Sequence, residues 1–446
     1  MRKYIVTIVL TLTGSIAAQA QLTFSRLNDK AIAIKPENNT GIESVYIIDS
    51  TDGIDATYNA SSASATVEWS RYSQLGGGYS EPIPFTRNGT ECTISLGSDD
   101  MGYIITDNGR QHCYWVVNYD KHTMSLNGAT VNTAESDCAM TAIEVDGEAP
   151  RITYYTITGV PRDLSRDIEI TYRSLSWDDD SQSFNQSVEK ETAAYISGST
   201  IRVAAPLCDT DFEISGDRFL KEWGREMNIV TDNYATVAID AHTSASMATR
   251  DNDNEISVDN GELGGSAPVD ITFTAVASDA VAYREWQMSS YPDFDIIDLR
   301  FNQDEVEYTF TNFGVTYVRY VAANASGDCE WISDTYQVSI GDSKIECPNA
   351  FSPGASEGIN DEWKVSYKSI TQFECHVFNQ WGVKLFSTTD PSQGWDGKYG
   401  GKTVPAGVYY YVIKARGADG KNYSLSGDIN IINYRQGSNK VGTPAE

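Results

Sequence analysis

The sequence predicts an all-β chain of tandem β-sandwich modules that ends in a small antiparallel β-sandwich. Three observations predict this class. Runs of alternating apolar and polar residues recur between turn signals along the 446 residues, which is the period of strands with one buried face. Helical periodicity is almost absent and favours only one short helix, over residues 217–227. A pattern of Trp, Tyr and Cys also occurs twice, which indicates repeated modules.

Residues 1–20 have the layout of a secretory signal peptide. Arg2 and Lys3 precede an apolar run, and small residues follow up to Ala20, where we expect cleavage. The alternative, a transmembrane anchor, needs about 20 apolar residues, whereas this run is interrupted at Thr11. We therefore expect an exported protein without direct membrane insertion. Its remaining length fits three or four domains at roughly 100 to 150 residues each.

The charge of the chain is strongly negative. Asp and Glu number 62 and Lys and Arg 33, which gives a formal net charge of −29. A surface of this sign repels nucleic acid and anionic lipid, so neither is an expected partner. We interpret the acidity as a means of keeping an exported protein soluble and dispersed.

Two segments of the chain repeat one pattern. Trp69 lies 44 residues before Cys113, and Trp286 lies 43 residues before Cys329. In each copy a tyrosine opens an alternating strand before the cysteine, and a second tryptophan follows that cysteine by two positions. A single large aromatic side chain that fills the space between two sheets is typical of an immunoglobulin-like sandwich. We therefore predict such modules at residues 21–140 and 257–343, with Trp69 and Trp286 in their cores.

The second copy also resembles a known family. The pattern "GVTYVRYVAANASGDCEW", preceded by "YREWQ", is similar to the PKD-type immunoglobulin-like domains of bacterial surface proteins. This resemblance implies a spacer or interaction module without chemistry. Residues 141–256 between the copies predict a further β-sandwich domain, of no family that its residues identify.

Seven cysteines occur in the chain. Export permits disulfides, but the number is odd and the density is low for a disulfide scaffold. Cys92 with Cys113 and Cys347 with Cys375 are the first pairings to test, because each pair lies within one predicted domain. We expect at least one remaining thiol to be free or to pair with another chain.

The last module, residues 344–434, has the clearest local signals. An alternating strand over 373–378 leads into a turn at 379–382 and a second strand, which predicts a hairpin. The stretch "GWDGKYGGKTVPAGVYYYVI", residues 394–413, predicts two turns and then a strand with Tyr409 and Tyr411 on one face and Tyr410 on the other. The segment "GDINII" closes a final hairpin. Together these elements form a small antiparallel sandwich.

This module resembles the gliding-motility-associated C-terminal domain, the type B sorting signal of the Bacteroidota type IX secretion system. The resemblance rests on "PNAF", "GINDEW", "FNQWGVKLF", the stretch quoted above and the final "GDINI". It implies that the domain is recognised by the type IX secretion machinery, with a PorP/SprF-like outer-membrane protein as partner. It also implies delivery to the cell surface or the medium. The residues that the motifs assign to recognition are Pro348, Asn349, Phe351, Asn360, Asp361, Trp381, Gly382, Trp395, Asp396, Gly397, Gly407 and Tyr409.

The module departs from the family pattern in two places. The loop that ends in Asn360 and Asp361 lacks the first aspartate of the family's P-N-G-D-G-x-N-D motif, which puts any cation bound by that loop in doubt. We expect residues 435–446, beyond the last predicted strand, to form a flexible tail, which is a candidate segment for processing or attachment.

Two acidic clusters are candidates for chemistry. Asp251, Asp253, Glu255, Asp259 and Glu262 follow the ligand spacing of a calcium loop, but isoleucine stands where that loop needs glycine and no helices flank it, so an acidic linker is the simpler interpretation. A hydrolase site would draw on carboxylates in 141–256. These candidates are Asp178, Asp179, Glu189, Glu222 and Asp240.

The motifs of the usual enzyme classes are absent from the sequence. It contains no H-E-x-x-H, no G-x-S-x-G and no phosphate-binding glycine loop. We therefore predict a non-catalytic, cofactor-free multi-domain protein of the cell surface or medium that acts in surface assembly, adhesion or binding. The alternative is a secreted hydrolase with its site in residues 141–256.

Overall fold

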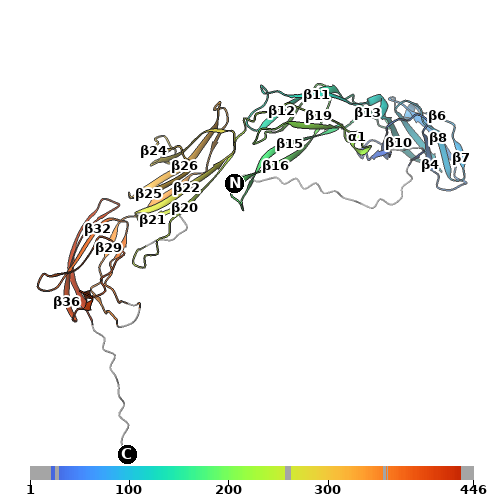
Figure 1. Ribbon diagram of the computed structural model, residues 1–446. Helices are drawn as coiled ribbons and strands as arrows, with labels where there is room; N and C mark the ends of the chain where they lie inside the picture. The colour runs from blue at the N-terminus through green and yellow to red at the C-terminus, as the bar shows by residue number, and fades with distance from the viewer. Residues whose placement is uncertain (1–21, 26–29, 257–262, 355–357, 359, 433–446) are drawn as a thin grey trace, which may run out of the picture. The chain divides into compact units, whose positions relative to one another are not determined.

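The computed structural model describes residues 22–25, 30–256, 263–354, 358 and 360–432. Strands make up most of this part of the chain (Figure 1). It contains one α-helix, α1 (Arg218–Glu222), and two 3-10 segments, η1 (Gly77–Tyr79) and η2 (Tyr119–His122). The all-β class predicted from the alternating pattern is confirmed. The predicted signal peptide, residues 1–20, and the predicted tail, residues 435–446, lie outside the described residues.

The predicted helix over 217–227 is shorter than expected. α1 begins after Asp217, whose carboxylate accepts the backbone N–H groups of Phe219 and Leu220 at 3.1 Å each and so caps the first turn. The helix ends because Gly224 takes a positive φ of 68°, and the next strand begins at Met227. In the described part of the chain, no helix has the length and apolarity needed to cross a membrane.

The first module is a sandwich of two sheets. Their strand orders are β1-β4-β8-β7 and β2-β3-β10-β9-β5-β6. The core between the sheets contains Trp69, which is 2% exposed, as predicted. The strands are β1 (Thr23–Phe24), β2 (Ile32–Ile34), β3 (Ser44–Ile48), β4 (Asp55–Asn59), β5 (Val67–Tyr72), β6 (Glu81–Pro82), β7 (Thr86–Asn88), β8 (Glu91–Ser95), β9 (Met101–Asp107) and β10 (Arg110–Asn118).

The second module packs its core against the outer face of the first module's six-stranded sheet. Its sheets have the orders β11-β12-β17, β13-β14 and β16-β15-β18-β19. Trp115 and Val117, on the outer face of the six-stranded sheet, pack in one cluster with Ile143, Ile152 and Phe212. The strands are β11 (Ser125–Val131), β12 (Met140–Glu148), β13 (Ile152–Tyr155), β14 (Pro161–Leu164), β15 (Asp167–Asp178), β16 (Ser183–Ala194), β17 (Thr200–Ala204), β18 (Phe212–Gly216) and β19 (Met227–Val230).

The third module is again a two-sheet sandwich. The orders are β20-β22-β25 and β21-β28-β26-β23-β24, with β27 paired to β26. Trp286 is fully buried between the sheets, as predicted. The strands are β20 (Ala241–Met247), β21 (Leu263–Gly265), β22 (Val269–Ala277), β23 (Val281–Ser289), β24 (Leu299–Phe301), β25 (Glu305–Phe310), β26 (Gly314–Asn324), β27 (Glu330–Ile332) and β28 (Tyr336–Ile340).

The last module is built on one five-stranded sheet, β30-β37-β36-β32-β33, with the pairs β29-β31 and β34-β35. The predicted hairpin is present, because β32 and β33 are antiparallel and joined by a turn in which Gly382 has a φ of 77°. The strands are β29 (Lys344–Glu346), β30 (Ala350–Phe351), β31 (Ser366–Lys368), β32 (Ile370–Phe378), β33 (Lys384–Thr388), β34 (Lys398–Tyr399), β35 (Lys402–Thr403), β36 (Gly407–Gly417) and β37 (Asn422–Ile431).

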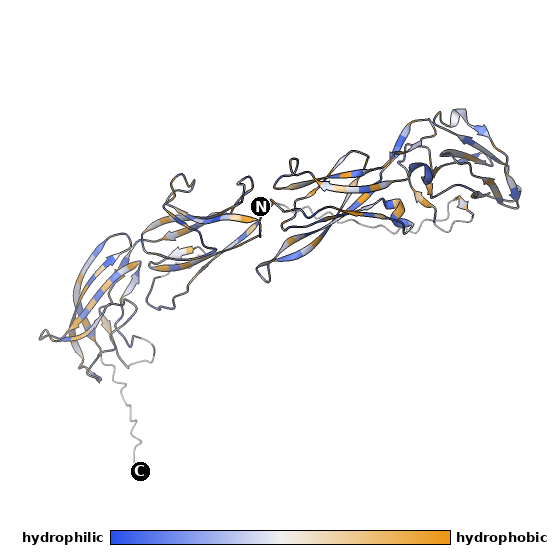
Figure 2. Ribbon diagram, turned by 45° about the horizontal axis from the view of Figure 1, so that its top comes forward, coloured by the Kyte–Doolittle hydropathy of each residue, from blue (hydrophilic) through white to orange (hydrophobic). Residues whose placement is uncertain are grey.

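Alternation along the strands explains why the sequence forms sheets. In β22 every second residue from Val269 to Ala275 is buried, and the residues between them are more exposed. Figure 2 shows the same change between hydrophilic and hydrophobic residues along many strands. Because side chains alternate between the two faces of a strand, this pattern gives one face to the core and the other to water.

The described residues divide into two compact units. One holds the residues up to Ser174 together with Gln186–Thr236, and the other holds Leu175–Asn185 together with the residues from Val237 onward. The tip of the β15–β16 hairpin belongs to the second unit because Trp177 stacks on His242, with ring centroids 4.0 Å apart and an interplanar angle of 3°.

Candidate functional site

Three of the predicted recognition residues form the core of the last module. Phe351, Trp395 and Tyr409 are buried, and the ring of Trp395 lies 5.6 Å from that of Phe351 and 5.3 Å from that of Tyr409. The Tyr409 hydroxyl donates to the Pro405 carbonyl at 2.7 Å. A macromolecular partner cannot contact such side chains without unfolding the module. Their role in the folded domain is therefore structural.

Most of the other predicted recognition residues hold loops in place. Asp361 accepts the backbone N–H groups of Gly354 and Gly358 at 2.8 and 2.7 Å. The backbone carbonyl of Asn360 accepts the N–H of Ser352 at 2.9 Å, and Asn360 itself has a φ of 55°. The Asp361 carboxylate thus holds its own loop together by two hydrogen bonds, a role that a bound cation would otherwise have.

Backbone hydrogen bonds, one ion pair and two turn glycines account for five more of the motif residues. The Pro348 carbonyl accepts the Trp363 indole N–H at 2.7 Å, and the Asn349 carbonyl accepts the backbone N–H of Asn430 at 2.9 Å. Asp396 forms an ion pair with Lys398 at 2.8 Å. Gly397 and Gly407 have φ angles of 70° and 156°, in the region that favours glycine.

Trp381 differs from these residues because its side chain is 80% exposed. It lies in the turn between β32 and β33, where the Asn379 carboxamide oxygen accepts the backbone N–H groups of Trp381 and Val383 at 2.9 and 3.0 Å. Among the three consecutive tyrosines, Tyr409 is buried and Tyr410 is exposed, as the predicted alternation requires. The motif therefore contains an exposed aromatic surface in addition to its structural residues.

The predicted disulfide between Cys92 and Cys113 is wrong, since both thiols are free. Cys92, on β8, packs in the core between the two sheets of the first module. Cys113, on β10, faces the other side of the six-stranded sheet and packs with Trp115. The sheet separates the two sulfurs, so they cannot bond. Burial raises the pKa of the Cys113 thiol to about 11.

The predicted pair Cys347 and Cys375 also consists of free thiols. Cys375 is buried on the inner face of β32, and burial together with the nearby Cys347 raises its pKa to about 12. Burial also raises the pKa of Cys347, and a hydrogen bond with Tyr411 opposes this rise. Cys347 is held by that tyrosine instead of by a sulfur–sulfur bond. These free thiols agree with the expectation that at least one would remain.

The acidic cluster predicted as a calcium candidate lies against the last module. Asp253 forms an ion pair with Lys364 at 3.2 Å, and Glu255 forms one with Arg250 at 2.7 Å. Asp251 is exposed, and Asp259 and Glu262 lie outside the described residues. Within the described ranges, no group of three or more His, Cys, Asp or Glu could hold a metal ion. An acidic linker stays the prediction for this segment, and calcium binding stays its alternative.

The carboxylates predicted for a hydrolase site are spread over several elements. Asp178 accepts the Ser181 hydroxyl, which lowers the pKa of this exposed carboxyl, and Asp179 accepts the Trp177 indole N–H at 2.9 Å. Glu189, on β16, accepts the Ser187 hydroxyl at 2.7 Å. The remaining two are Glu222, at the end of α1, and Asp240, whose Oδ2 lies 3.8 Å from His242 Nε2.

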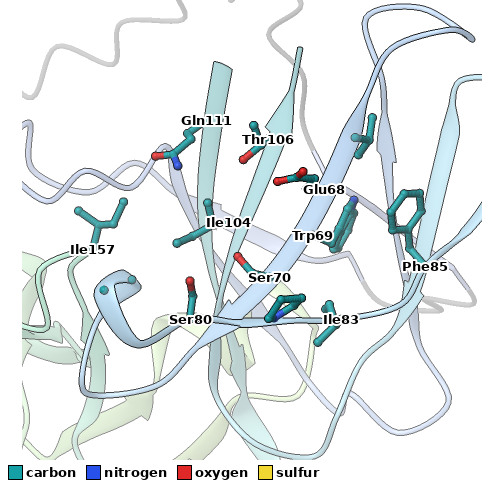
Figure 3. Close-up of a pocket in the computed structure, with 14 residues that line it drawn as sticks. Glu68, Trp69, Ser70, Ser80, Ile83, Phe85, Ile104, Thr106, Gln111 and Ile157 are labelled. Atoms are coloured by element: carbon teal, nitrogen blue, oxygen red, sulfur yellow. The ribbon is translucent and has the colours of Figure 1, made fainter. Parts of the chain in front are cut away.

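A groove of about 770 Å³ lies on the first module beside β5. Glu68 pairs with Thr106, which pairs with Gln111, so these three residues form one row across β5, β9 and β10. Figure 3 shows their side chains above Ile104, with Ile157 at one end of the groove. Trp69 and Phe85 lie at the other end. The row offers a carboxylate, a hydroxyl and an amide to a polar ligand.

One polar atom near this groove has no partner. Nε1 of Trp69 is buried and makes no hydrogen bond within the described part of the chain, although Trp69 lines the groove. A buried donor without an acceptor costs free energy. Gly77 of η1 leaves room beside this groove, because a Cβ on it would lie 2.8 Å from the Ile104 side chain.

The last module matches a known protein family. Residues 345–431 match the CHU_C type IX secretion signal domain, and residues 130–231 match a fibronectin type III domain. The chain is thus a multi-domain protein of β-sandwich modules, one of them similar to a fibronectin type III domain, followed by a secretion signal domain. More particularly, it carries the signal of the type IX pathway, so the type IX machinery handles it and exports it to the cell surface or the extracellular space.

Solved structures with tandem β-sandwich domains are similar to the chain at low identity. A tetra-tandem repeat from the extending region of a large adhesion protein is 11% identical, with 86% of this chain and 97% of that chain covered and a TM-score of 0.21. Sidekick-1 immunoglobulin domains 1–5 are 12% identical, with 91% and 81% covered and a TM-score of 0.26. The fibronectin(III)-like modules of Clostridium thermocellum CbhA are 14% identical, with 45% and 100% covered and a TM-score of 0.18. None of the curated proteins compared with the chain matches it.

Proposed function

We propose that this protein is a non-catalytic component of the cell surface, whose three upstream β-sandwich modules act in surface assembly, adhesion or binding. The secretion signal domain delivers these modules, with a PorP/SprF-like outer-membrane protein as its partner. The second module and its carboxylates serve the same structural purpose as the other modules. The support for each part of this proposal differs, and each part has its own test.

The use of charged groups in the upstream modules is the observation that carries the non-catalytic proposal. Two of the least exposed ion pairs of these modules are closed structural pairs. The Arg166 guanidinium and the Asp217 carboxylate, 3% and 0% exposed, lie 2.7 Å apart. His122 Nε2 lies 2.6 Å from Asp100 Oδ2. A catalytic acid or base needs instead to face a substrate in a cleft.

The groove on the first module supports a binding role. Its polar row is formed by residues of three strands, and a rigid sheet fixes such side chains better than a loop does. A ligand that reaches Glu68, Thr106 and Gln111 would be recognised by hydrogen bonds. We expect Glu68→Ala with Gln111→Ala to weaken adhesion of cells that display the protein, whereas Glu91→Ala, on β8 of the other sheet, leaves it unchanged. Equal adhesion of cells that display any of these variants would exclude the groove as the adhesive binding site.

Removal of residues 344–446 tests the delivery step. We expect the shortened protein to accumulate inside the outer membrane, because it lacks the domain that the machinery handles. Immunolabelling of intact cells and fractionation measure this. Normal surface display without these residues would contradict the assigned role of the domain.

The partner and the absence of catalysis need biochemical tests. Affinity capture from solubilised outer membranes, with the mature protein as bait, is expected to recover a PorP/SprF-like protein. Recovery that persists after removal of residues 344–446 would show that another module binds it. Turnover of any glycan or peptide in a substrate screen, abolished by substitution of Asp178 or Glu189, would replace this proposal with the secreted hydrolase.

A further inference from the structure

The five-stranded sheet of the last module exposes large apolar side chains on its outer face. Val408, Tyr410 and Val412 alternate along β36 and are 46%, 47% and 39% exposed. Trp381 and Val383, in the adjoining β32–β33 turn region, are 80% and 45% exposed. We call these five residues the open face. Contiguous exposed apolar residues of this kind mark interaction surfaces in soluble proteins.

Strand register places the β36 residues of the open face beside one another and away from the core. Tyr410 pairs with Phe378 of β32, and Val412 pairs with His376 of the same strand. The residues of opposite parity on β36 point inward, where Tyr409 packs on Trp395 and Ile413 is fully buried. The outward side chains are therefore not required for the core.

The open face lies at the end of the module that is remote from the third module. At the other end of β36, the outward residues are the exposed Lys414 and Arg416. Ala418, just after β36, packs with the core of the third module, and its carbonyl accepts the backbone N–H of Phe313 at 3.1 Å. Tyr410 and Ala418 are eight residues apart, or about 27 Å along a strand. A partner at the open face thus avoids the contacts with the third module.

The charge of the last module differs from that of the whole chain. Residues 345–431 contain nine Asp and Glu and eight Lys and Arg, whereas the whole chain contains 62 and 33. The module is close to neutral while the chain that precedes it is strongly acidic. A near-neutral apolar surface can approach another protein without the like-charge repulsion that keeps the rest of the chain dispersed.

We propose that the open face is the surface by which a protein of the type IX secretion machinery recognises this domain. Trp381 and Tyr410 are the anchors, because tryptophan and tyrosine dominate binding energy at protein interfaces. The partner presents an apolar groove that buries both rings. This inference rests on the proposed delivery role of the domain, and it places recognition on exposed residues instead of on Phe351, Trp395 and Tyr409, which form the core.

The test compares secretion of full-length variants in cells that carry the type IX machinery. Trp381→Ala combined with Tyr410→Ala is expected to lower the secreted or displayed fraction by about ten-fold or more, the change expected when two interface anchors are removed. The matched control is Tyr399→Ala, which removes a 52% exposed tyrosine from β34 of the same module. Its secretion should equal that of the parent. Normal secretion of the double variant would overturn the proposal.

Two further measurements distinguish loss of binding at the open face from loss of folding and from failure of the delivery role. The purified double variant should unfold at the same denaturant concentration as the parent, since neither side chain is in the core. If the double variant is instead destabilised, the secretion of the single variant Trp381→Ala tests the open face. This side chain is the most exposed of the five, so its removal should affect folding least. If removal of residues 344–446 blocks secretion and the open-face variants do not, the delivery role stands and only the open face is excluded.

Other occupants of the open face give different results. If residues 433–446 cover the open face, their removal should increase hydrogen exchange of β36 and should also reduce secretion. Occupation by a second copy predicts a dimer in sedimentation that Tyr410→Ala dissociates. We expect a monomer, unchanged exchange of β36 without the tail, and normal secretion of that shortened chain. Either of the alternative results would overturn the proposal.

Discussion

Two of the places where neighbouring modules meet are held by different physical interactions. Between the first and second modules, Trp115 lies in the apolar cluster that joins the outer face of the six-stranded sheet to the core of the second module, and its ring is 5.7 Å from that of Tyr155. Between the third module and the last, polar groups dominate. Ser343 and Asp419 share two hydrogen bonds, and Ser369 N donates to Ser266 Oγ at 2.8 Å. We call these the apolar joint and the polar joint.

This difference indicates which modules depend on one another. Burial of aromatic surface at the apolar joint makes the first two modules one cooperative unit, because neither can expose that surface alone. Hydrogen bonds at the polar joint can be exchanged for hydrogen bonds to water at low cost. The secretion signal domain is thus attached as a separable module. Four substitutions test this contrast.

The largest effect is expected for Arg166→Met at the apolar joint. Arg166 donates to Asp217, to the Tyr119 hydroxyl at 2.7 Å and to the carbonyls of His122 and Pro150 at 2.6 and 2.8 Å. The substitution leaves the buried Asp217 carboxylate without its cation, which costs about 3–5 kcal/mol. Chemical denaturation of the mature chain measures the loss, as a shift of the transition of the first unit.

The control for Arg166→Met is Arg173→Met. Arg173 is 54% exposed and pairs with the exposed Asp211 at 3.2 Å, so its removal should cost at most about 1 kcal/mol. Equal shifts for the two variants would contradict the assignment of Arg166 as the central cation of the apolar joint. A shift in the transition of the third module would contradict the separation of the two units.

A smaller effect is expected for Gly76→Ala at the same joint. Gly76 has a φ of 81°, and a Cβ there would lie 2.5 Å from the backbone nitrogen of Gly159 in the second module. The substitution combines backbone strain with overpacking and should cost about 1–3 kcal/mol. Gly78→Ala, where a Cβ meets nothing within 4 Å, should change stability by less than about 0.5 kcal/mol. An equal loss of stability for Gly78→Ala would show that any alanine in or beside η1 destabilises the fold, whether or not its Cβ meets the second module.

The sequence predicted the local elements of both joints but not the contacts that hold them. Alternation placed Trp69 and Trp286 in cores, because strand period and residue size are local properties. The apolar joint depends on Trp115 facing outward from its own sandwich, and periodicity does not say which face meets a second module. Asp217 stands before a helical pattern, which signals a cap, but its partner Arg166 is 51 positions away. Pairing of Cys92 with Cys113 failed for the same reason, since sequence proximity does not reveal opposite faces.

The candidate site was predicted in part. The motif identified the module and included Trp381, yet most of its other residues form turns or core, because a family's motif records the residues that fold the domain together with those that bind. Val408, Tyr410 and Val412 carry one available signal: three apolar residues at every second position, on the opposite parity from Tyr409 and Ile413. The sequence alone does not distinguish this pattern from a strand that is buried on both faces, and only the exposure of these three side chains in the structure does.

At the polar joint we expect Asp419→Ala to cost about 1 kcal/mol, the typical value of a hydrogen bond in an exposed setting. Asp419 accepts the Ser343 hydroxyl at 2.7 Å and the Ser343 backbone N–H at 3.1 Å. Exchange of the Ser343 amide, measured by hydrogen–deuterium exchange on the mature chain, should rise. Asp428→Ala, an exposed aspartate on β37, should leave that amide unchanged.

The contribution of Asp419 to the stability of the folded chain should decrease as the pH falls. The hydrogen bond from Ser343 is the main cause that lowers the pKa of this carboxyl below its ordinary value of 3.8. Because the pKa of Asp419 is lower in the folded state, this carboxylate stabilises the fold at pH values above its ordinary pKa of 3.8. The stabilisation is lost as the pH falls through the pKa of the folded state. The difference in unfolding midpoint between the parent and Asp419→Ala should therefore narrow between pH 5 and pH 2. A constant difference would show that the aspartate acts through packing.

The smallest effect is expected for Asp253→Asn in the segment that precedes residue 257. Asp253 is 77% exposed, and its pair with Lys364 should contribute about 0–1 kcal/mol and less at high salt. The same segment is also held by Asn254, whose side-chain amide donates to the carbonyls of Val365 and Pro391 at 2.7 and 2.9 Å, and by the backbone, where the Tyr367 amide donates to the Asn254 carbonyl.

These two kinds of contact at neighbouring positions decide what the polar joint consists of. If hydrogen bonds hold it, exchange of the Tyr367 amide rises clearly for Asn254→Ala and hardly for Asp253→Asn, and 1 M salt has little effect. If ion pairs hold it, Asp253→Asn and salt both raise the exchange. The first result is expected because an exposed ion pair is screened by water and salt, whereas a carboxamide that donates to two backbone carbonyls needs a fixed geometry that salt does not disturb.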